Sequence, residues 1–503
     1  MRFLQRLNKP VYMLLAVAAL AGGLRFWDLG YPAERVFDEV YYSKDACLYL
    51  GNSLKTCDVD SSDEKYWVKE RDEVGSWVHP PMGKWMIAIG EKLFGPTPFG
   101  WRFSAALFGT LTCVLVAAMA LLMFRSVLWG FVAGLLMATE SLSFVMSRVA
   151  LLDVFVGFWV TLGFYFLLLD RRWIHRRSNL IEQESPPRPD VPMVDATQAI
   201  TDQPEVPVVP PLAPDVPMVT TMPVAVPSPI WRPWRFAMGV AFGAAAATKW
   251  SGVYALAGAI LLTLLWERTR RKATGQPHPF WKAVAQEAFG IIVALAVVPV
   301  GVYLLSYVRY WMLNGIHPTD FWALQQAMEQ FHTTLDRLKE GGKLTHPYES
   351  QPWTFFIMAR PVDFFFKPGS QGAEILAIGN PAIFWGSIIA IPYCVRSWRK
   401  RRDARAGLIV VAVLAQWLPW FIFANRVQFF FYMVPLVPFM VLACVYALRR
   451  LSDSTKGKGG YSISVITLIS ISVGLFIFFW PVLTGFPLNS FWWHKRIWFP
   501  GWF

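Results

Sequence analysis

Residues 104–123 read SAALFGTLTCVLVAAMALLM, a run of twenty residues without a charged side chain. An α-helix rises about 1.5 Å per residue, so about 20 apolar residues are needed to cross the hydrocarbon core of a bilayer. Two similar runs follow directly, at residues 127–146 and 149–169. The sequence therefore predicts membrane-spanning helices. It excludes an outer-membrane β-barrel, whose strands are alternating segments of about ten residues.

The composition extends this prediction to the whole chain. Of 503 residues, 55% are hydrophobic and 16% are charged, whereas a soluble domain carries about 25% charged residues. This balance excludes a soluble globular, a disordered and a disulfide-stapled secreted protein. Further apolar runs lie at residues 10–28, 236–249, 251–266, 286–308, 377–395, 407–424, 428–447 and 462–482. We therefore expect an all-α polytopic membrane protein with about eleven transmembrane helices.

The basic residues predict an orientation. They gather in alternate short loops, after residues 169, 266 and 395. The positive-inside rule then places the N-terminus in the cytoplasm and the C-terminus outside, with two long outer loops at 31–103 and 309–376. Because most Lys and Arg lie in short loops, the net charge of +13 indicates membrane orientation and argues against nucleic-acid binding.

The chain divides into three predicted parts. Residues 1–177 form an N-terminal module that carries the first outer loop, and residues 231–503 form a C-terminal transmembrane module that carries the second. Residues 178–230 between them are dominated by Pro, Val and acidic residues. With few aromatic residues this segment cannot form a core, so it predicts a disordered cytoplasmic linker whose role stays open.

The cysteines and the missing motifs limit the chemistry. Cys47 and Cys57 share a polar outer loop and could form a disulfide if that loop faces an oxidising compartment. The sequence contains no metal-binding Cys/His spacing, no Gly-rich phosphate loop and no dinucleotide fingerprint. If the protein is a transferase, its activated donor therefore has to arrive through the membrane as a lipid phosphate.

Two adjacent carboxylates are the first candidate site. Asp38 and Glu39 lie in RVFDEVYY at residues 35–42, about ten residues after the first predicted span. Such a pair, between aromatic residues and just above a bilayer, can supply a general base whose pKa is raised by partial burial. Two solvated loop acids are the alternative.

Cations at the predicted membrane surface are the second candidate. A charge inside a bilayer is costly and normally faces a cavity or a partner. His79 and Lys84 flank HPPMGK, whose prolines introduce an interfacial helix at the depth of a lipid phosphate. A basic pocket for an anionic head group is also predicted from the outer ends of the spans, at Arg25, Arg102, Arg148 with Asp153, Lys249 and Arg426. A merely structural ion pair between Arg148 and Asp153 is the alternative.

The second outer loop is the third candidate. It holds THPYESQPW at residues 345–353. Aromatic faces can stack on sugar rings, so His346, Tyr348 and Trp353 predict a sugar or peptide cleft. Asn425, next to Arg426, adds an amide at the outer start of a span. The alternative is that the same residues form a packed turn with no binding role.

In this order, the motifs resemble those of the protein O-mannosyltransferases, membrane glycosyltransferases of GT-C architecture. The matching stretches are FDEVYY at 37–42, HPPMGK at 79–84, Arg102, SRVALLD at 147–153, TKWS at 248–251, residues 346–353, GNP at 379–381 and Asn425 with Arg426. The resemblance covers nearly the whole chain apart from the Pro-rich segment and the extreme C-terminus.

The resemblance implies an inverting transfer of mannose from a polyprenyl phosphate to Ser or Thr hydroxyls of exported polypeptides. In that family the residue corresponding to Asp38 is regarded as the base, with Glu39 as its neighbour. Lys84, Arg102, Arg148 and Arg426 become candidates to stabilise the departing phosphate. No cofactor is certain; a divalent cation and contact with the secretion machinery stay open.

The short second loop implies a location. Eukaryotic members carry a β-trefoil domain there, and a loop of about 65 residues is too small for one. The resemblance is therefore to a bacterial member in the plasma membrane. Two alternatives remain: a GT-C transferase acting on a lipid or polysaccharide, and a transporter or flippase. HPPMGK and TKWS argue against the first, and the absence of inverted repeats argues against the second.

Overall fold

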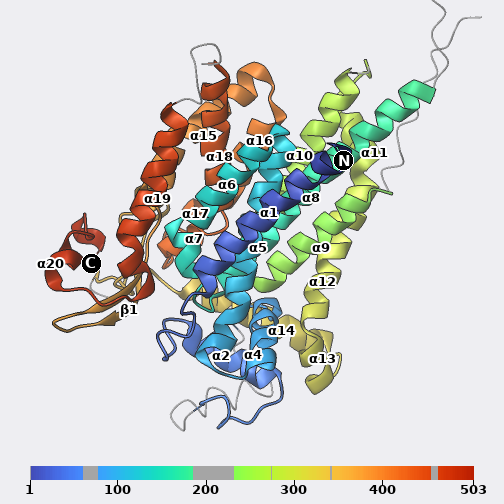
Figure 1. Cartoon of the computed structure of the whole chain (residues 1–503). Helices are drawn as coiled ribbons and strands as arrows, with labels where there is room; N and C mark the ends of the chain where they lie inside the picture. Colours follow the sequence, from blue (N-terminus) through green and yellow to red (C-terminus); the bar gives the residue numbers. More distant parts are fainter. Residues whose placement is uncertain are drawn as a thin grey trace, which may run out of the picture.

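The computed structural model describes residues 2–59, 78–184, 231–273, 275–339, 342–454 and 463–502. Most of these residues form helices that run side by side as an elongated bundle (Figure 1). Of the predicted linker, residues 178–184 continue a helix, and residues 185–230 lie outside the described part of the chain. Residues 178–184 were predicted to belong to the linker and are helical instead, because α8 continues to Glu184.

The bundle helices are α1 (Arg2–Phe26), α5 (Pro98–Phe124), α6 (Val127–Ala138), α7 (Ser141–Met146), α8 (Leu152–Glu184), α9 (Pro233–Thr248), α10 (Gly252–Ala273), α11 (Pro279–Ile292), a π-helical turn (Val293–Val297), α12 (Val298–Ser306), α15 (Pro381–Arg401), α16 (Ala404–Trp417), α17 (Pro419–Ile422), α18 (Val437–Ser454) and α19 (Ile463–Thr484). Among the residues that the structure describes, six segments are long and apolar enough to cross a membrane: Lys9–Phe26, Pro98–Phe124, Leu152–Arg177, Pro279–Ser306, Ala404–Ile422 and Ile463–Thr484. This is a polytopic helical protein.

One predicted span is broken. The run at 127–146 forms α6 and then α7, with Glu140 at the break. The Glu140 carboxylate accepts hydrogen bonds from the backbone N–H groups of Leu142 and Ser143, at 3.2 and 2.7 Å, and so caps α7. A carboxylate at a helix start satisfies N–H groups that have no partner inside the helix.

Shorter elements cover one end of the bundle and one flank. They are α2 (Glu39–Tyr49), α4 (Met82–Phe94), α13 (Val308–Asn314), α14 (Pro318–Thr334), a 3-10 turn (Pro352–Ile357), β1 (Val362–Lys367), β2 (Ala373–Ala377) and α20 (Ser490–His494). The strands pair antiparallel, with Val362 opposite Ala377. The prediction of an all-α fold is wrong in this detail, because the predicted second outer loop contains a hairpin.

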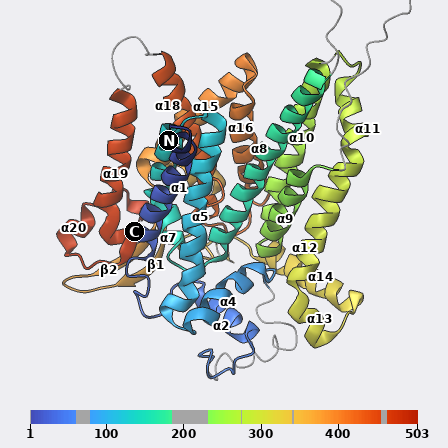
Figure 2. The same ribbon diagram turned by 45° about the vertical axis from the view of Figure 1, so that its right-hand side comes forward.

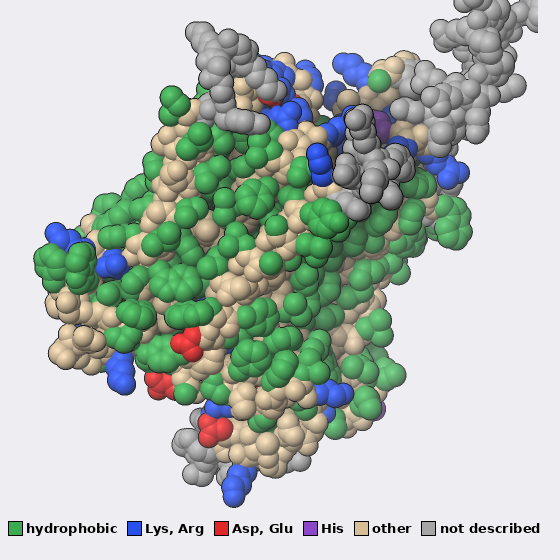
Figure 3. Space-filling view, in the orientation of Figure 1, with side chains coloured by type: hydrophobic (Ala, Val, Ile, Leu, Met, Phe, Trp, Pro, Cys, Tyr) green, Lys and Arg blue, Asp and Glu red, His purple; other side chains and the backbone are tan. Residues whose placement is uncertain are grey.

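The two ends of the bundle differ. The chain enters α1 at one end, which also holds the ends of α8, α10 and α15 and which we call the basic end (Figure 1). The opposite end carries α2 and α4 and is called the Asp38 end; α13 and α14 lie beside these helices (Figure 2). Hydrophobic side chains cover the face between the two ends, while charged side chains gather toward the ends (Figure 3). This surface suits a bilayer around the middle of the molecule.

A disulfide secures the segment after α2, in the loop that the sequence predicts to be outside the membrane. Cys47, near the end of α2, is bonded to Cys57, with the two Cα atoms 5.6 Å apart. Both cysteines are fully buried in a small apolar cluster with Leu48 and Val59. The sequence left this bond open, and the structure contains it.

Candidate active site

Asp38 stands where the chain turns from α1 into α2. Phe37 before it has a φ of +49°, and its ring packs 5.0 Å from Phe364 and 5.8 Å from Phe431, measured between ring centres. Asp38 is half-buried and accepts a long hydrogen bond, 3.4 Å, from the Tyr42 hydroxyl. Burial raises the pKa of Asp38 to about 6, against the opposing effect of the Lys249 charge.

Glu39, the neighbouring carboxylate, is held on every side. Its two oxygens accept hydrogen bonds from the Arg102 guanidinium, each at 2.8 Å. They also accept the backbone N–H groups of Ala150 at 2.8 Å and Val36 at 3.0 Å. Glu39 is fully buried. It therefore fixes α2 against α5 and the start of α8, and this geometry leaves no free oxygen for catalysis.

Arg102 has no donor left for a phosphate. Besides its two bonds to Glu39, it donates to the carbonyl oxygens of Leu29, Pro32 and Glu34, at 3.3, 2.7 and 3.0 Å. All five guanidinium N–H groups are thus used within a fully buried site. The prediction that Arg102 binds the donor phosphate does not fit this geometry, because its role is to hold the turn after α1.

Lys84 is likewise committed to packing. Its ammonium lies 3.1 Å from the Asp45 carboxylate, and both side chains are fully buried. Arg25 donates to the Ser147 and Ser143 hydroxyls at 3.1 and 3.3 Å, away from any solvent. Lys84 and Arg25 thus hold neighbouring elements together, and their predicted phosphate contacts stay predictions.

Arg148 caps the end of α1. It donates to the carbonyl oxygens of Arg25, Trp27 and Asp28. The last carbonyl groups of a helix have no partner within the helix, and a cation there is favourable. The alternative ion pair with Asp153 does not form, because these carbonyl groups occupy Arg148 and a lysine occupies Asp153.

Lys249, directly after α9, forms the charged centre of the site. Its ammonium lies 3.0 and 3.1 Å from the two carboxylate oxygens of Asp153, in the first turn of α8. It also lies 4.4 Å from the centre of the Tyr432 ring, which favours a cation at that distance. The charges of this pair act on the carboxylate of Asp38: Lys249 lowers the pKa of Asp38 and Asp153 raises it.

A close helix contact brings HPPMGK to the same place. A Cβ atom on Gly83 would lie 2.7 Å from Leu152 and 2.9 Å from Thr248, so only glycine lets α4 approach α8 and α9 this closely. The His79 ring, just before α4, packs against Tyr42 at 6.2 Å. Burial and the Lys249 charge hold the pKa of His79 well below its usual range, so its imidazole is neutral.

A histidine that the sequence analysis did not predict lies next to His79. His332, near the end of α14, stacks on His79 with 4.9 Å between ring centres. Its Nδ1 accepts from the Arg426 guanidinium at 2.8 Å, so its Nε2 carries the proton and donates to the Val78 carbonyl at 2.9 Å. Burial and Arg426 lower the pKa of His332 to about 4. Arg426 itself keeps a buried Nε–H without a hydrogen-bond partner in the described residues.

The second outer loop reaches the site only in part. The His346 ring packs 4.8 Å from Phe429 and 6.2 Å from Phe37, next to Asp38, and its Nδ1 accepts the Tyr348 backbone N–H at 3.2 Å. Trp353 is 58% exposed and contacts Phe421, so it is not gathered with the others. Asn425 is also exposed.

The missed residue carried little signal in the sequence. His332 is one polar residue in an amphipathic helix, and its partners lie 254 residues upstream, at Val78, and 94 residues downstream, at Arg426. A histidine next to no motif is usually a surface or packing residue. Only the packing of α14 against the entry of α4 reveals it.

The assembled site offers a half-buried carboxylate beside cations and neutral imidazoles. A carboxylate with a raised pKa is suited to accept a proton, and positive side chains are suited to stabilise a departing anion. No group of three or more His, Cys, Asp and Glu side chains in the described ranges could hold a metal ion. The site is therefore suited to accept a proton and to stabilise an anionic leaving group.

The fold matches that of a solved membrane glycosyltransferase. It superimposes on a structure of the Saccharomyces cerevisiae protein O-mannosyltransferase Pmt1–Pmt2 complex bound to the sugar donor, with a TM-score of 0.71 and 14% identity, over 98% of this chain and 92% of that chain. Together with its apolar helices, this similarity defines the class: a membrane protein with the GT-C glycosyltransferase fold.

The sequence comparisons define the family. Residues 15–179 match the model of the dolichyl-phosphate-mannose-protein mannosyltransferases, and residues 318–502 match the C-terminal four-helix transmembrane region of protein O-mannosyltransferases. A polyprenol-phosphate-mannose–protein mannosyltransferase of Mycolicibacterium smegmatis is 31% identical over 97% of this chain and 92% of its own length. One of Mycobacterium tuberculosis is 30% identical, over 97% and 90%. The chain belongs to the protein O-mannosyltransferase family.

Proposed function

We propose that this enzyme transfers mannose from a polyprenyl phosphate to Ser and Thr hydroxyls of exported polypeptides, with Asp38 as the general base. The observation that carries the proposal is the contrast between two neighbours. Glu39 is fully engaged, while Asp38 is half-buried and has no ion-pair partner among the described residues. The names of the relatives supply the donor and the acceptor class.

The proposed reaction is a single displacement. The acceptor hydroxyl oxygen attacks the anomeric carbon of mannose and forms the new C–O bond, while the bond from that carbon to the phosphate oxygen breaks. The hydroxyl proton passes to the Asp38 carboxylate, and the electron pair leaves with the polyprenyl phosphate. Attack opposite the leaving group inverts the anomeric centre, so a β-linked donor gives an α-mannoside.

Lys249 and Arg426 are the cations proposed to meet the leaving phosphate. Lys249 is held by Asp153 and its charge acts on Asp38, and the buried Nε–H of Arg426 has no hydrogen-bond partner in the described part of the chain. Charge-assisted hydrogen bonds of this kind are strong and short. His79 and His332 lie next to each other at the site, and both rings are neutral because their pKa values are lowered. They add no positive charge, so Lys249 and Arg426 are the cations of the proposal.

The finer arrangement in the membrane belongs to this proposal. We propose about eleven spans, a cytoplasmic N-terminus, and the Asp38 end and C-terminus outside the plasma membrane of a bacterial cell. The basic end supports this orientation through the positive-inside rule, and the Cys47–Cys57 disulfide supports an oxidising side for α2. A divalent-cation requirement and contact with the secretion machinery stay predictions.

A reconstituted transfer assay tests the proposal. The full chain in proteoliposomes receives polyprenyl-phosphate mannose and either a Thr-rich peptide, the same peptide with Ala at each Thr, or a lipid acceptor. We expect mannose on the Thr peptide alone. Transfer to the lipid acceptor alone would favour another GT-C activity, and movement of a solute without any transfer would favour a transporter.

A further inference from the structure

Residues 485–502 follow α19, the last helix of the bundle, and contain α20; we call them the C-terminal segment. This segment turns back along α19, since the Trp498 ring packs 5.0 Å from Phe479 and 6.2 Å from Trp385, measured between ring centres. Phe479 lies five residues before Thr484, where α19 ends. Because a helix rises about 1.5 Å per residue, the segment reaches about 8 Å from that end toward the middle of the bundle.

A turn and a strand hold the C-terminal segment in this position. Gly485, at the turn, has a φ of +72°, a backbone conformation that favours glycine. The backbone N–H groups of Gly372 and Leu488 each donate to the carbonyl oxygen of the other at 2.8 Å. The indole N–H of Trp493 donates to the buried Glu374 carboxylate of β2 at 2.6 Å. The segment is therefore fixed to the β1–β2 hairpin as well as to α19.

The helix along which this segment folds has a large apolar surface. Only 22% of the most apolar part of α19 is buried inside the protein. The isoleucines that α19 exposes are Ile463, Ile466, Ile471 and Ile477. Its end lies on the Asp38 side of the bundle, because the Trp480 ring packs 5.3 Å from Trp27, directly after α1. In two views α20 lies at the outer flank of α19 (Figure 1 and Figure 2). A helix with such a surface faces lipid, so the segment lies next to lipid too.

The C-terminal segment combines exposed aromatic rings with positive charges. The aromatic side chains that it exposes are Phe486, Phe491, Trp492, Trp498 and Phe499. It contains His494, Lys495 and Arg496 but no Asp or Glu. The Lys495 ammonium lies 5.4 Å from the centre of the Phe491 ring, and the Arg496 guanidinium lies 4.7 Å from that of Phe478. Figure 3 shows hydrophobic side chains beside those of Lys and Arg over α20. This combination is typical of a membrane–water interface.

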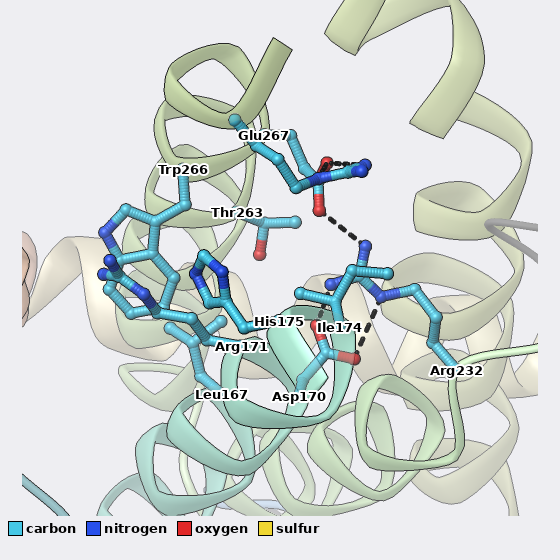
Figure 4. Close-up of a pocket in the computed structure, with 10 residues that line it drawn as sticks. Leu167, Asp170, Arg171, Ile174, His175, Arg232, Thr263, Trp266 and Glu267 are labelled. Carbon is cyan, nitrogen blue, oxygen red and sulfur yellow. Dashed lines mark hydrogen bonds and ion pairs between the residues drawn. The ribbon is translucent and has the colours of Figure 1, made fainter. Parts of the chain in front are cut away.

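These cations differ from those at the basic end. There, Arg232 donates to both carboxylate oxygens of Asp170, at 3.0 and 2.5 Å, and to Glu267 at 2.6 Å (Figure 4). Lys495 is exposed and has no ion pair within the residues that the structure describes. Paired and buried arginines hold helices together, whereas an exposed lysine without an acid partner can meet the phosphate groups of lipids.

We propose that the C-terminal segment is an interfacial anchor, which inserts its exposed aromatic side chains among the lipid head groups of the leaflet on the Asp38 side. The fold-back of about 8 Å agrees with the depth of about 5–10 Å to which interfacial segments bury their apolar face. The partner is the bilayer itself, because the segment continues the apolar surface of α19. Phe364 of the attached hairpin packs 5.0 Å from Phe37, next to Asp38, so the anchor also fixes the depth of the chain around Asp38.

Spin labels at exposed positions test the inference. Single cysteines are introduced into the full chain as Phe491→Cys and Phe499→Cys in the C-terminal segment, with Ile477→Cys in α19 and Glu329→Cys in α14 as controls. The free native cysteines among the described residues are buried and escape labelling. In proteoliposomes, accessibility to oxygen and to a water-soluble nickel chelate gives the depth of each label. We expect the Phe491 and Phe499 labels at about 5–10 Å, between an Ile477 label in the hydrocarbon and a Glu329 label in water.

The other outcomes would overturn the anchor. A label at Phe491 or Phe499 that is as accessible to the nickel chelate as the Glu329 label would place the segment in water. A label shielded from both oxygen and the chelate, with dipolar broadening between labelled chains, would assign the surface to a second copy of this chain. The Ile477 label must lie in the hydrocarbon in the same preparation, which shows that the chain is inserted.

Discussion

The two ends of the bundle share buried ion pairs but differ in one carboxylate. At the basic end, Asp170, Glu267 and Glu287 each meet arginines at 2.5 to 2.9 Å, and these side chains are almost completely buried. At the Asp38 end, Glu39 is paired in the same way, but within the described ranges Asp38 has only a long bond from Tyr42 and the Arg426 Nε–H has no hydrogen-bond partner. Fully paired charges hold helices together. A charged side chain with an unused hydrogen-bonding group can still bind a substrate.

The same contrast separates Asp38 from Glu39 within one dipeptide. Glu39 behaves like the carboxylates of the basic end, with arginine and backbone partners. Asp38 does not. Substitutions at each of these charges test whether the division between structural and chemical charges is real.

Removing the Asp38 carboxylate should abolish transfer. Without a general base we expect Asp38→Asn to lose about 10³-fold in turnover, with unchanged thermal stability because no ion pair is broken. Mannose transfer and thermal unfolding are measured on the same sample. Asp58→Asn, at a 78% exposed loop acid, is the matched control and should transfer normally. Near wild-type turnover by Asp38→Asn would remove the proposed base.

Removing the Arg102 guanidinium should act on stability. Arg102→Gln leaves Glu39 buried without its ion-pair partner, a change that costs about 3–5 kcal/mol of folding free energy. The readouts are thermal unfolding in detergent and the donor KM of the fraction that stays folded. We expect a large drop in stability and an unchanged donor KM. A normal unfolding temperature with a raised donor KM would restore Arg102 as a phosphate ligand.

Removing the Lys249 charge should act on catalysis and on donor use together. Lys249→Gln is expected to lose about 10²-fold in turnover, since the leaving phosphate loses one preorganised cation. Lys249→Arg, which keeps the charge, should recover part of this loss. The exposed Lys92 of α4 supplies the control, Lys92→Gln. Equal activity of Lys249→Gln and Lys92→Gln would exclude the proposed phosphate role.

The smallest effect concerns pH. Because Asp38 accepts a proton only when ionised and burial raises its pKa to about 6, kcat/KM should fall as the pH drops below about 6 and level off above it. The Tyr42 hydrogen bond lowers this pKa, so Tyr42→Phe should move the profile to higher pH by about half a unit. A shift to lower pH, or a flat profile, would contradict the assignment.

The sequence predicted the class of fold because membrane helices are encoded locally. Long apolar runs such as residues 104–123 and 149–169 indicate membrane helices without any knowledge of tertiary contacts. The first run lies within α5, and most of the second lies within α8. The broken run at 127–146 could not be foreseen in the same way. Its break is capped by Glu140, which also accepts the N–H group of Asn380, 240 residues away.

Several residues of the candidate site were predicted from the sequence. Which of these residues pair with one another was not. The residue types and motifs pointed to Asp38, Lys249, His79 and Arg426. Which cation neutralises which acid depends on tertiary contacts: Arg102 reaches Glu39 across 63 residues, and Lys249 reaches Asp153 across 96. The sequence therefore offered six cations for one phosphate, and Lys249 and Arg426 are the two that we propose for it.

A structure of the chain with polyprenyl-phosphate mannose and a Thr peptide bound tests the central claim most directly. The account predicts the acceptor hydroxyl within about 3 Å of an Asp38 carboxylate oxygen and the phosphate within about 3 Å of Lys249 or Arg426. Arg102 and Lys84 are predicted to stay on Glu39 and Asp45. A phosphate held by Arg102 or Lys84, or an acceptor hydroxyl remote from Asp38, would contradict it.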